Sequence, residues 1–247
     1  MKITNFSKFL AVAFAASSLM LTSCGTDPVA PVPVVKEYAK VMLFHGATDA
    51  TAVNLQIDGT TKGDSIKYGQ VTAYNQAELT AGKKVVVSSL VAKSGAKIAT
   101  DSILMNKDVG YSYFVYQESD AAKTVSMIKS VDDLTLPAAG KARIRLVHLI
   151  PDLSTGIDFE LVATGGVATT RSDFTNVKFK DIKNFIDVTP GTYDIKVKIT
   201  GTVQPQVLIT STITVTLVSG NLYTSIVRGY ANAIAPRGGT VTTFGNN

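Results

Sequence analysis

The sequence has a single cysteine, no tryptophan and few charged residues. Cys24 cannot form a disulfide within the chain, and no second thiol is available for a thiolate metal site. Only 17% of the residues are charged, whereas 45% are hydrophobic. These proportions are typical of an exported all-β protein that is stabilised by core packing alone.

Catalytic motifs are missing as well. The sequence contains no glycine-rich phosphate loop, no His-Glu-x-x-His motif and no Gly-x-Ser-x-Gly motif. Two adjacent carboxylates, Asp132 and Asp133, fall in a segment that is typical of a linker, where we expect nothing to bury them. The sequence therefore predicts that the protein is not an enzyme and has no catalytic residues, no cofactor and no metal.

The charge of the chain argues against one further class of partner. The 24 basic and 19 acidic residues give a formal net charge of only +5, far below that of a dedicated nucleic-acid binder. Lys141, Arg143 and Arg145 form a basic row that strand alternation places outward. We expect water to solvate this row, with an anionic glycan as its alternative partner, and we expect no nucleic-acid partner.

The first 23 residues have the layout of a secretory signal peptide. Lys2 and Lys8 precede an apolar run, Phe9–Leu21, that is too short to span a bilayer. Cys24 directly follows Leu-Thr-Ser, an arrangement that resembles the bacterial lipobox, whose cysteine becomes the lipidated N-terminus. The resemblance implies lipidation at Cys24 and a lipid anchor in the outer membrane, on its periplasmic or its cell-surface face. The alternative is an ordinary signal peptide followed by a free cysteine.

Beyond a Pro-rich linker at residues 24–37, the chain consists of short runs with period-two alternation, separated by turn residues. Val41–His45 and Ile144–His148 are examples, and no window of helical length shows a persuasive apolar stripe. The sequence therefore predicts an all-β fold.

The alternating runs occur twice in the same order. Lys40–His45 matches Arg143–His148, and the two histidines are 103 positions apart, a period too long for a solenoid. The further matches are Val53–Ile57 with Ile157–Leu161, Ile66–Tyr68 with Val177–Phe179, Thr80–Gly82 with Thr189–Gly191, and Tyr111-Ser112 with Tyr223-Thr224. We therefore expect a duplicated domain, with sandwich domains at 38–118 and 141–230, a linker at 119–140 and a tail at 231–247.

These landmarks resemble the family named domain of unknown function 4397. Its members open with a strand ending in His, continue through a Pro-Asp turn and close on a strand begun by Tyr-Thr. The second copy fits more clearly than the first, through Pro151-Asp152, Pro190–Tyr193 and Tyr223-Thr224. The resemblance implies two tandem immunoglobulin-like β-sandwiches in an exported bacterial lipoprotein, as in Bacteroidota. It implies no activity, because none is established for the family.

The only two histidines occupy the same repeat position, and each is followed four residues later by an aspartate: His45 with Asp49, and His148 with Asp152. One hypothesis is a metal or acid–base site in each domain. The other is structural, because alternation places each imidazole on the apolar face at a strand end, where it can bond to the following turn. We favour the structural hypothesis, since two ligands are too few for a zinc site.

Six of the nine tyrosines lie in the first copy, and Tyr111 and Tyr113 share one strand face. An exposed pair of rings could stack on sugar or anchor a protein partner, whereas buried rings would be core residues. We therefore take Tyr111 and Tyr113 as possible ligand contacts. The function expected from the sequence is a non-catalytic, envelope-anchored binding, scaffolding or adhesion module. The alternative is a carbohydrate-binding accessory lipoprotein of a glycan-uptake system, and a hydrolase is the least favoured.

Overall fold

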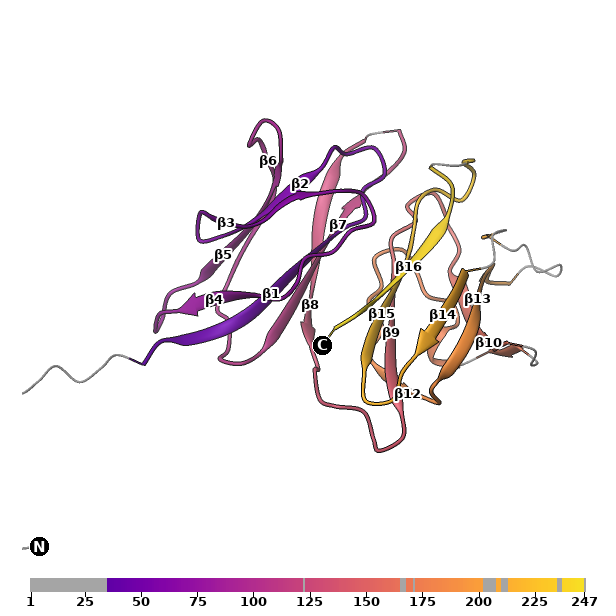
Figure 1. Ribbon diagram of the computed structural model, residues 1–247. Coiled ribbons are helices and arrows are strands. Elements are labelled where there is room, and N and C mark those ends of the chain that lie inside the picture. The colour runs from indigo at the N-terminus through magenta and orange to yellow at the C-terminus, as the bar shows by residue number, and fades with distance from the viewer. Residues whose placement is uncertain are drawn as a thin grey trace, which may run out of the picture. The chain divides into compact units, whose positions relative to one another are not determined.

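Strands follow one another along the described chain, as the alternating pattern predicts (Figure 1). The computed structural model describes residues 35–121, 123–164, 168–170, 172–201, 208–209, 213–234 and 237–246, without the side chains of 168–170 and 172. The predicted signal peptide, Cys24 and most of the Pro-rich linker lie outside these residues. Within them, no helix is long and apolar enough to cross a membrane. The chain divides into two units, Met1–Val35 and Lys36–Asn247, and both copies of the repeat lie in the second unit.

The first copy is a β-sandwich of two four-stranded sheets. One sheet has the order β4-β1-β7-β8 and consists of β4 (Asn75–Leu79), β1 (Glu37–His45), β7 (Gly110–Gln117) and β8 (Val125–Asp132). The other has the order β3-β2-β5-β6 and consists of β3 (Thr60–Ile66), β2 (Val53–Ile57), β5 (Val85–Val91) and β6 (Lys97–Ile103). Strands β1 and β7 run parallel, and all other neighbours run antiparallel.

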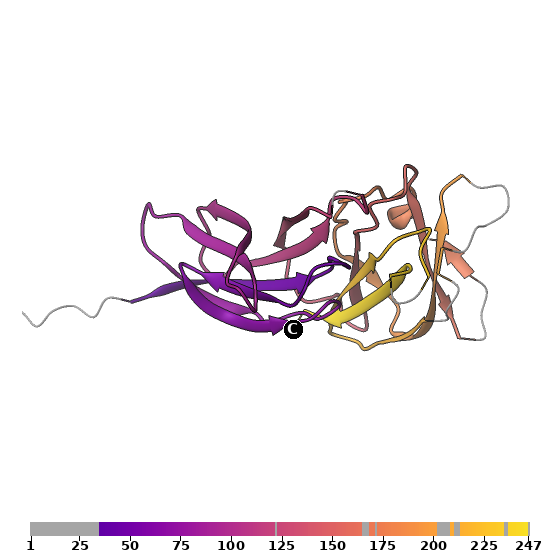
Figure 2. The same ribbon diagram turned by 90° about the horizontal axis from the view of Figure 1, so that it is seen from above.

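The second copy repeats this arrangement strand for strand. Its first sheet has the order β12-β9-β15-β16 and consists of β12 (Ile186–Val188), β9 (Ala142–His148), β15 (Leu222–Arg228) and β16 (Thr240–Gly245). Its second sheet has the order β11-β10-β13-β14 and consists of β11 (Ala168–Thr170), β10 (Ile157–Ala163), β13 (Gly191–Ile199) and β14 (Ile213–Leu217). A 3-10 turn, η1 (Ser172–Phe174), follows β11, and β9 and β15 are the parallel pair. Figure 2 shows the strands of each copy in two layers.

The duplication extends to single backbone hydrogen bonds. The amide of His45 donates to the carbonyl of Gln70, and the amide of His148 donates to that of Asp181, both at 3.0 Å. Since the same donor position selects the same acceptor position in both copies, the fold itself is duplicated. The all-β sandwich architecture that the sequence predicts is therefore confirmed.

Each copy has its own hydrophobic core, and a third cluster joins the two copies. The two cores include Val41, Leu43 and Tyr113 in the first copy, and Ile144 and Leu146 in the second. The third cluster consists of Phe44, Phe114, Tyr116, Val147, Leu149 and Ile226. These residues come from β1 and β7 of one copy and from β15 and the end of β9 of the other. The β1–β7 sheet therefore packs against the β9–β15 sheet.

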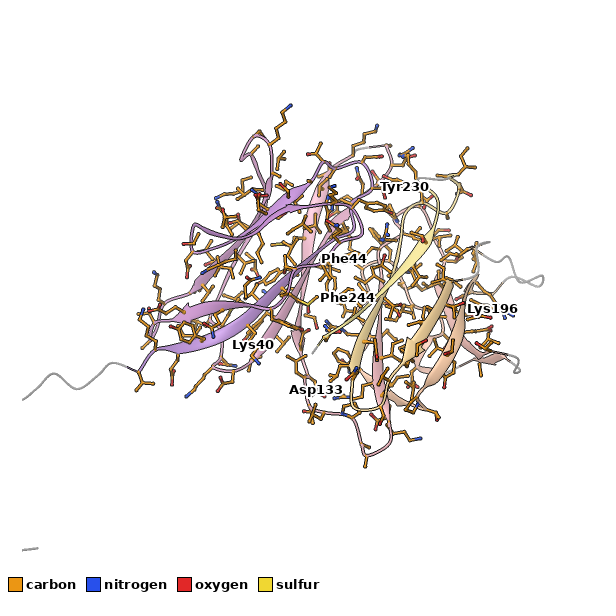
Figure 3. The ribbon with its side chains drawn as sticks, in the orientation of Figure 1. Lys40, Phe44, Asp133, Lys196, Tyr230 and Phe244 are labelled. Atoms are coloured by element: carbon orange, nitrogen blue, oxygen red, sulfur yellow. The ribbon has the colours of Figure 1, made fainter. Side chains whose placement is uncertain are left out.

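This packing explains why the central strands of these mainly antiparallel sheets are buried on both faces. All eight residues of β7 are buried, although alternation normally leaves one face of such a strand in water. Phe244 packs against the shared cluster, and its ring stacks on that of Phe44 with their centroids 5.8 Å apart (Figure 3). The outward face of each central sheet is thus part of a common interface.

Two predicted boundaries differ from the structure. Residues 125–132 of the predicted linker form β8, the edge strand next to β7, and residues 240–245 of the predicted tail form β16, next to β15. The two strands contain serine or threonine residues besides apolar ones. Such composition is difficult to distinguish from that of a polar linker.

Candidate functional site

His45 is a buried core residue that bonds to the loop after β1. Its ring is 0% exposed, and its Nε2 lies 2.9 Å from the carbonyl oxygen of Thr51. The amide of Ala47 donates to Nδ1 at 3.3 Å, so the neutral tautomer that carries its proton on Nε2 satisfies both bonds. Burial lowers the pKa of this imidazole.

His148 occupies the same place in the second copy but bonds through its other nitrogen. Its Nδ1 lies 2.9 Å from the carbonyl oxygen of Val177, and burial lowers its pKa as well. Its Nε2 is buried without a hydrogen-bond partner among the described residues. Neither histidine bonds to its aspartate, and the described chain contains no group of three His, Cys, Asp or Glu residues that could hold a metal ion. The contacts shown are those of structural residues.

The two aspartates have different roles. Asp152 accepts hydrogen bonds from the amides of Ala231 (2.8 Å) and Asn232 (3.2 Å) and so fixes the turn after β15 of its own copy. Asp49 reaches the other copy, where its carboxylate accepts two bonds from Arg237, at 2.9 and 2.8 Å. These bonds lower the pKa of Asp49. The pairs that look alike in sequence therefore serve separate structural purposes.

Tyr111 and Tyr113, the possible ligand contacts of the sequence, are buried. Tyr111 is 3% exposed and Tyr113 is 1% exposed, because both rings point into the core of the first sandwich. The hydroxyl of Tyr111 accepts a bond from the amide of Asn106 at 3.0 Å, and that of Tyr113 donates to Asp101 at 3.0 Å. Neither ring offers a face to a ligand, so a stacking platform at these positions is ruled out.

The predicted solvent exposure of the basic row is wrong for its third member, Arg145. Arg145 is 1% exposed and points into the interface between the copies, because the outward face of β9 is covered there. Its guanidinium lies over the ring of Phe185, 4.6 Å from the centroid. Its Nε donates to the hydroxyl of Thr224 at 2.8 Å, and its second amino group donates to Ser112 at 2.9 Å.

The charge of Arg145 is neutralised by Asp132, the carboxylate that the sequence assigned to an exposed linker. The two side chains are 2% and 0% exposed and lie 2.5 Å apart. Asp132 also accepts bonds from the hydroxyls of Tyr74 at 2.6 Å and Ser112 at 2.5 Å. Its neighbour Asp133 remains 60% exposed beside Arg143, whose hydrogen bond lowers the pKa of that carboxyl to about 2. Only one carboxylate of the pair is therefore buried.

Two grooves open along the edges of this interface. The first, which we call the β16 groove, has a volume of about 560 Å³ and is formed by residues 62–75 of the first copy and by Thr242 and Phe244 of β16. The second, the β8 groove, has a volume of about 390 Å³ and is formed by residues 130–133 beside Arg143, Arg145 and residues 183–185. Each groove needs both copies, because an edge strand of one copy faces a connecting segment of the other.

The β16 groove is lined by apolar, polar and charged side chains, the charged ones being Lys62 and Asp64. Ile66, Val71 and Phe244 line it together with the polar side chains of Gln70 and Asn75. Gln70 Oε1 accepts a bond from the amide of Lys67, and Asn75 Nδ2 donates to the carbonyl of Ala73, both at 2.9 Å. The side-chain NH₂ group of Gln70 and the side-chain carbonyl oxygen of Asn75 have no hydrogen bond to the described residues. An uncharged donor and an uncharged acceptor are thus available to a ligand.

The β8 groove has a different chemistry. Arg143 donates to the carbonyl oxygen of Thr135 and to Asp133, both at 2.8 Å, and Arg145 is committed to Asp132. Lys183 is the lining cation without an ion pair among the described residues. The two grooves occupy equivalent places in the two copies, but in the β16 groove Gln70 and Asn75 offer an uncommitted neutral donor and acceptor beside the charged side chains of Lys62 and Asp64. Sequence reasoning missed both grooves, because each joins residues that are far apart along the chain.

A further repeat-equivalent pair of tyrosines makes the same hydrogen bond in each copy. The hydroxyls of Tyr111 and Tyr223, near the start of β7 and β15, accept bonds from the amides of Asn106 and Val218. These bonds are similar to the tyrosine corner described for immunoglobulin-like sandwiches. Residues 39–155 match the family model described as a domain of unknown function, DUF4397. The DUF4397 match begins within β1, covers the rest of the first sandwich and extends through β9. The prediction that the second copy is the clearer member of the family is therefore wrong. No curated protein matches the chain.

Two solved structures match most of the chain at low similarity. One is a family 26 carbohydrate-binding module from Eubacterium rectale in complex with maltoheptaose, 13% identical, with 84% of this chain and 96% of that chain covered and a TM-score of 0.24. Another is a Bacteroides eggerthii protein whose name refers to cell adhesion, 13% identical, with 85% and 95% covered and a TM-score of 0.22.

Proposed function

We propose that this protein is a non-catalytic, lipid-anchored module of the outer membrane that binds its ligand in the β16 groove. The observation that carries the proposal is the construction of that groove from both copies, which a shared core and the buried Arg145–Asp132 pair hold together. A groove whose walls are fixed in this way is preformed, so a ligand does not have to order it on binding.

The anchor rests on the lipobox-like Leu21–Cys24 segment, with the Pro-rich linker as a semi-rigid stalk. The strand-for-strand equivalence of the two sandwiches supports extending the DUF4397 assignment to the second copy. Protease treatment of intact and lysed cells tests which face of the membrane the protein occupies. Fractionation of lysed cells tests the anchor, with Cys24→Ala as the control. We expect the wild type in the membrane fraction and the variant in the soluble fraction. A wild type that fractionates like Cys24→Ala contradicts the anchor.

A carbohydrate is the ligand that the lining of the β16 groove favours. Phe244 is a partly exposed aromatic ring at the groove, and sugar rings pack their apolar faces on aromatic rings. The free donor of Gln70 and the free acceptor of Asn75 suit neutral hydroxyl groups, which both donate and accept. The other candidate, a protein partner in scaffolding or adhesion, would use the same exposed groove through an extended segment along the β16 edge.

Affinity electrophoresis and titration calorimetry with soluble neutral glycans test the carbohydrate proposal. We expect retardation of the wild type and its loss in a Gln70→Ala/Asn75→Ala variant. A Lys183→Ala/Asn184→Ala variant in the β8 groove is the matched control and should bind as the wild type does. Equal binding by both variants places the glycan elsewhere. Binding to no glycan, together with cross-linking of a protein from a photoreactive residue at position 70, supports the protein partner instead.

A further inference from the structure

The buried ion pair between the copies has an uncharged counterpart on the opposite side of the interface. Arg145 and Met42 occupy the same position in the repeat, in β9 and β1. Asp132 is the last residue of β8, and Asn246, directly after β16, occupies the equivalent register position. Arg145 faces Asp132 at 2.5 Å. On the other side, Asn246 Nδ2 lies 3.8 Å from the sulfur of Met42. The same two positions therefore meet twice, once charged and once neutral.

Neighbouring contacts obey the same correspondence. The hydroxyl of Ser112 donates to Asp132 at 2.5 Å, and that of its equivalent, Thr224, donates to Asn246 at 2.6 Å. The two copies thus meet through equivalent faces, as two subunits do across a two-fold axis.

The aromatic contacts further along the interface repeat in the same way. The ring of Tyr116 meets that of Phe179, with centroids 5.7 Å apart. The equivalents of these residues are Arg228 and Tyr68, and the guanidinium of Arg228 lies 4.0 Å from the centre of the Tyr68 ring. A face that binds its own equivalent is self-complementary in shape, so shape alone would also allow two first copies, or two second copies, to pair.

Charge makes these like pairings unfavourable. Two first copies would bring Asp132 against Met42 twice, and two second copies would bring Arg145 against Asn246 twice. Either arrangement buries two charges without a counter-charge, which is strongly destabilising, whereas the unlike pairing neutralises both charges. Only the pairing seen in the structure satisfies every group at these positions.

We propose that the Arg145–Asp132 pair is a pairing code that makes each copy accept the unlike copy and reject a like copy from another chain. The partner that fits the face of the first copy is the second copy, and a foreign first copy is excluded by its carboxylate. Chains held close together on a membrane surface would otherwise exchange partners through this self-complementary face and form open-ended assemblies. The code keeps such chains monomeric.

Refolding of the full chain from denaturant at high protein concentration tests the code, with Cys24→Ala in every sample to prevent acylation. Sedimentation velocity then reports the size of the refolded species. An Arg145→Met/Asp132→Asn variant gives both sides the neutral lining, so that like and unlike pairings become equivalent. A Met42→Arg/Asn246→Asp variant instead gives each copy both charges, which makes like pairing equally satisfied. We expect the wild type to refold as a monomer and both variants to give dimers and larger species.

The matched control carries all four substitutions and so moves the ion pair to the opposite side of the interface. Each copy then bears one charge again, and we expect the refolded protein to return to the monomer. Monomeric refolding of either double variant, with native circular dichroism, overturns the proposal, because the linker alone would then suffice to select the partner. So does a wild type that refolds into oligomers. Should one double variant fail to refold, the other decides the question alone.

Discussion

The hydroxyls of Tyr111 and Tyr223 accept the same hydrogen bond, each from the backbone amide five residues earlier in the chain and each at 3.0 Å. The bond ties the start of β7, or of β15, to the connection that precedes it. Because both copies retain it, this bond belongs to the fold rather than to a binding site.

Replacing either tyrosine by phenylalanine should therefore destabilise the protein without affecting ligand binding. We expect Tyr111→Phe and Tyr223→Phe each to lower the free energy of unfolding by about 1 kcal/mol, the typical worth of one hydrogen bond. Urea denaturation measures the loss. Tyr38→Phe is the control, since the Tyr38 hydroxyl has no hydrogen bond to the described residues, and it should unfold as the wild type does. Equal losses in all three variants would contradict the role of this bond.

Breaking the buried ion pair should cost far more than breaking an exposed one. Asp132→Asn leaves the Arg145 guanidinium buried without a counter-charge, so we expect a loss of about 3–5 kcal/mol. Asp133→Asn removes the partly exposed partner of Arg143 and should cost less than about 1 kcal/mol. Denaturant unfolding of both variants makes the comparison. Similar losses at the two neighbouring aspartates would mean that Asp132 is not buried between the copies.

The two histidines should make the protein less stable in mild acid. Burial lowers the pKa of His45 and of His148, whereas histidine in an unfolded chain titrates near about 6.5. Below that pH the unfolded chain binds protons that the folded chain does not, so the free energy of unfolding falls as the pH decreases. Carboxylates with lowered pKa values cause a separate loss at lower pH, below about 4.5.

Unfolding at about pH 7.5 and about pH 5.5 tests this dependence. The variants are His45→Gln and His148→Asn, whose amide nitrogens can replace the donating ring nitrogens Nε2 and Nδ1. We expect each variant to lose less stability than the wild type between the two pH values. A wild-type stability that is unchanged over this interval would show that the histidines are not titrated by unfolding.

Gly69 and Gly59 should respond differently to the same substitution. Both have positive φ, at 82° and 78°, so alanine is strained at either position, by about 1–2 kcal/mol. A Cβ at Gly59 meets nothing within 4 Å, whereas one at Gly69 would lie 2.5 Å from a terminal nitrogen of Arg228. Gly69→Ala should therefore also displace Arg228 from the ring of Tyr68, adding about 0.5–2 kcal/mol. Thermal or urea unfolding distinguishes the two variants, and equal losses would argue against the Arg228–Tyr68 contact.

Alternation along the sequence is sufficient to find the sandwich and the inward side chains. It places His45 and His148 on the apolar face and identifies the repeat, because both depend on neighbouring residues within a strand. It cannot decide whether the opposite face meets water or another sheet. Arg145 is therefore expected in solvent, although the uninterrupted apolar run Val41–Phe44 in the equivalent strand is a signal of burial on both faces.

The grooves and the buried ion pair cannot be predicted from the sequence pattern alone. Asp132 and Arg145 are close in the chain, but their meeting depends on how two sheets pack, which no local pattern encodes. The β16 groove likewise brings Gln70 next to Phe244. Only the tertiary arrangement of the duplicated domains places these residues together.

The shared hydrophobic cluster affects how the protein folds while it is being synthesised. The β1–β7 sheet is complete once β8 has been synthesised, but its outer face, with Phe44, Phe114 and Tyr116, is covered only when the second copy folds onto it. A nascent chain therefore carries an adhesive apolar surface throughout the synthesis of its second half. We expect it to need a chaperone during that interval, and the finished pair to need none.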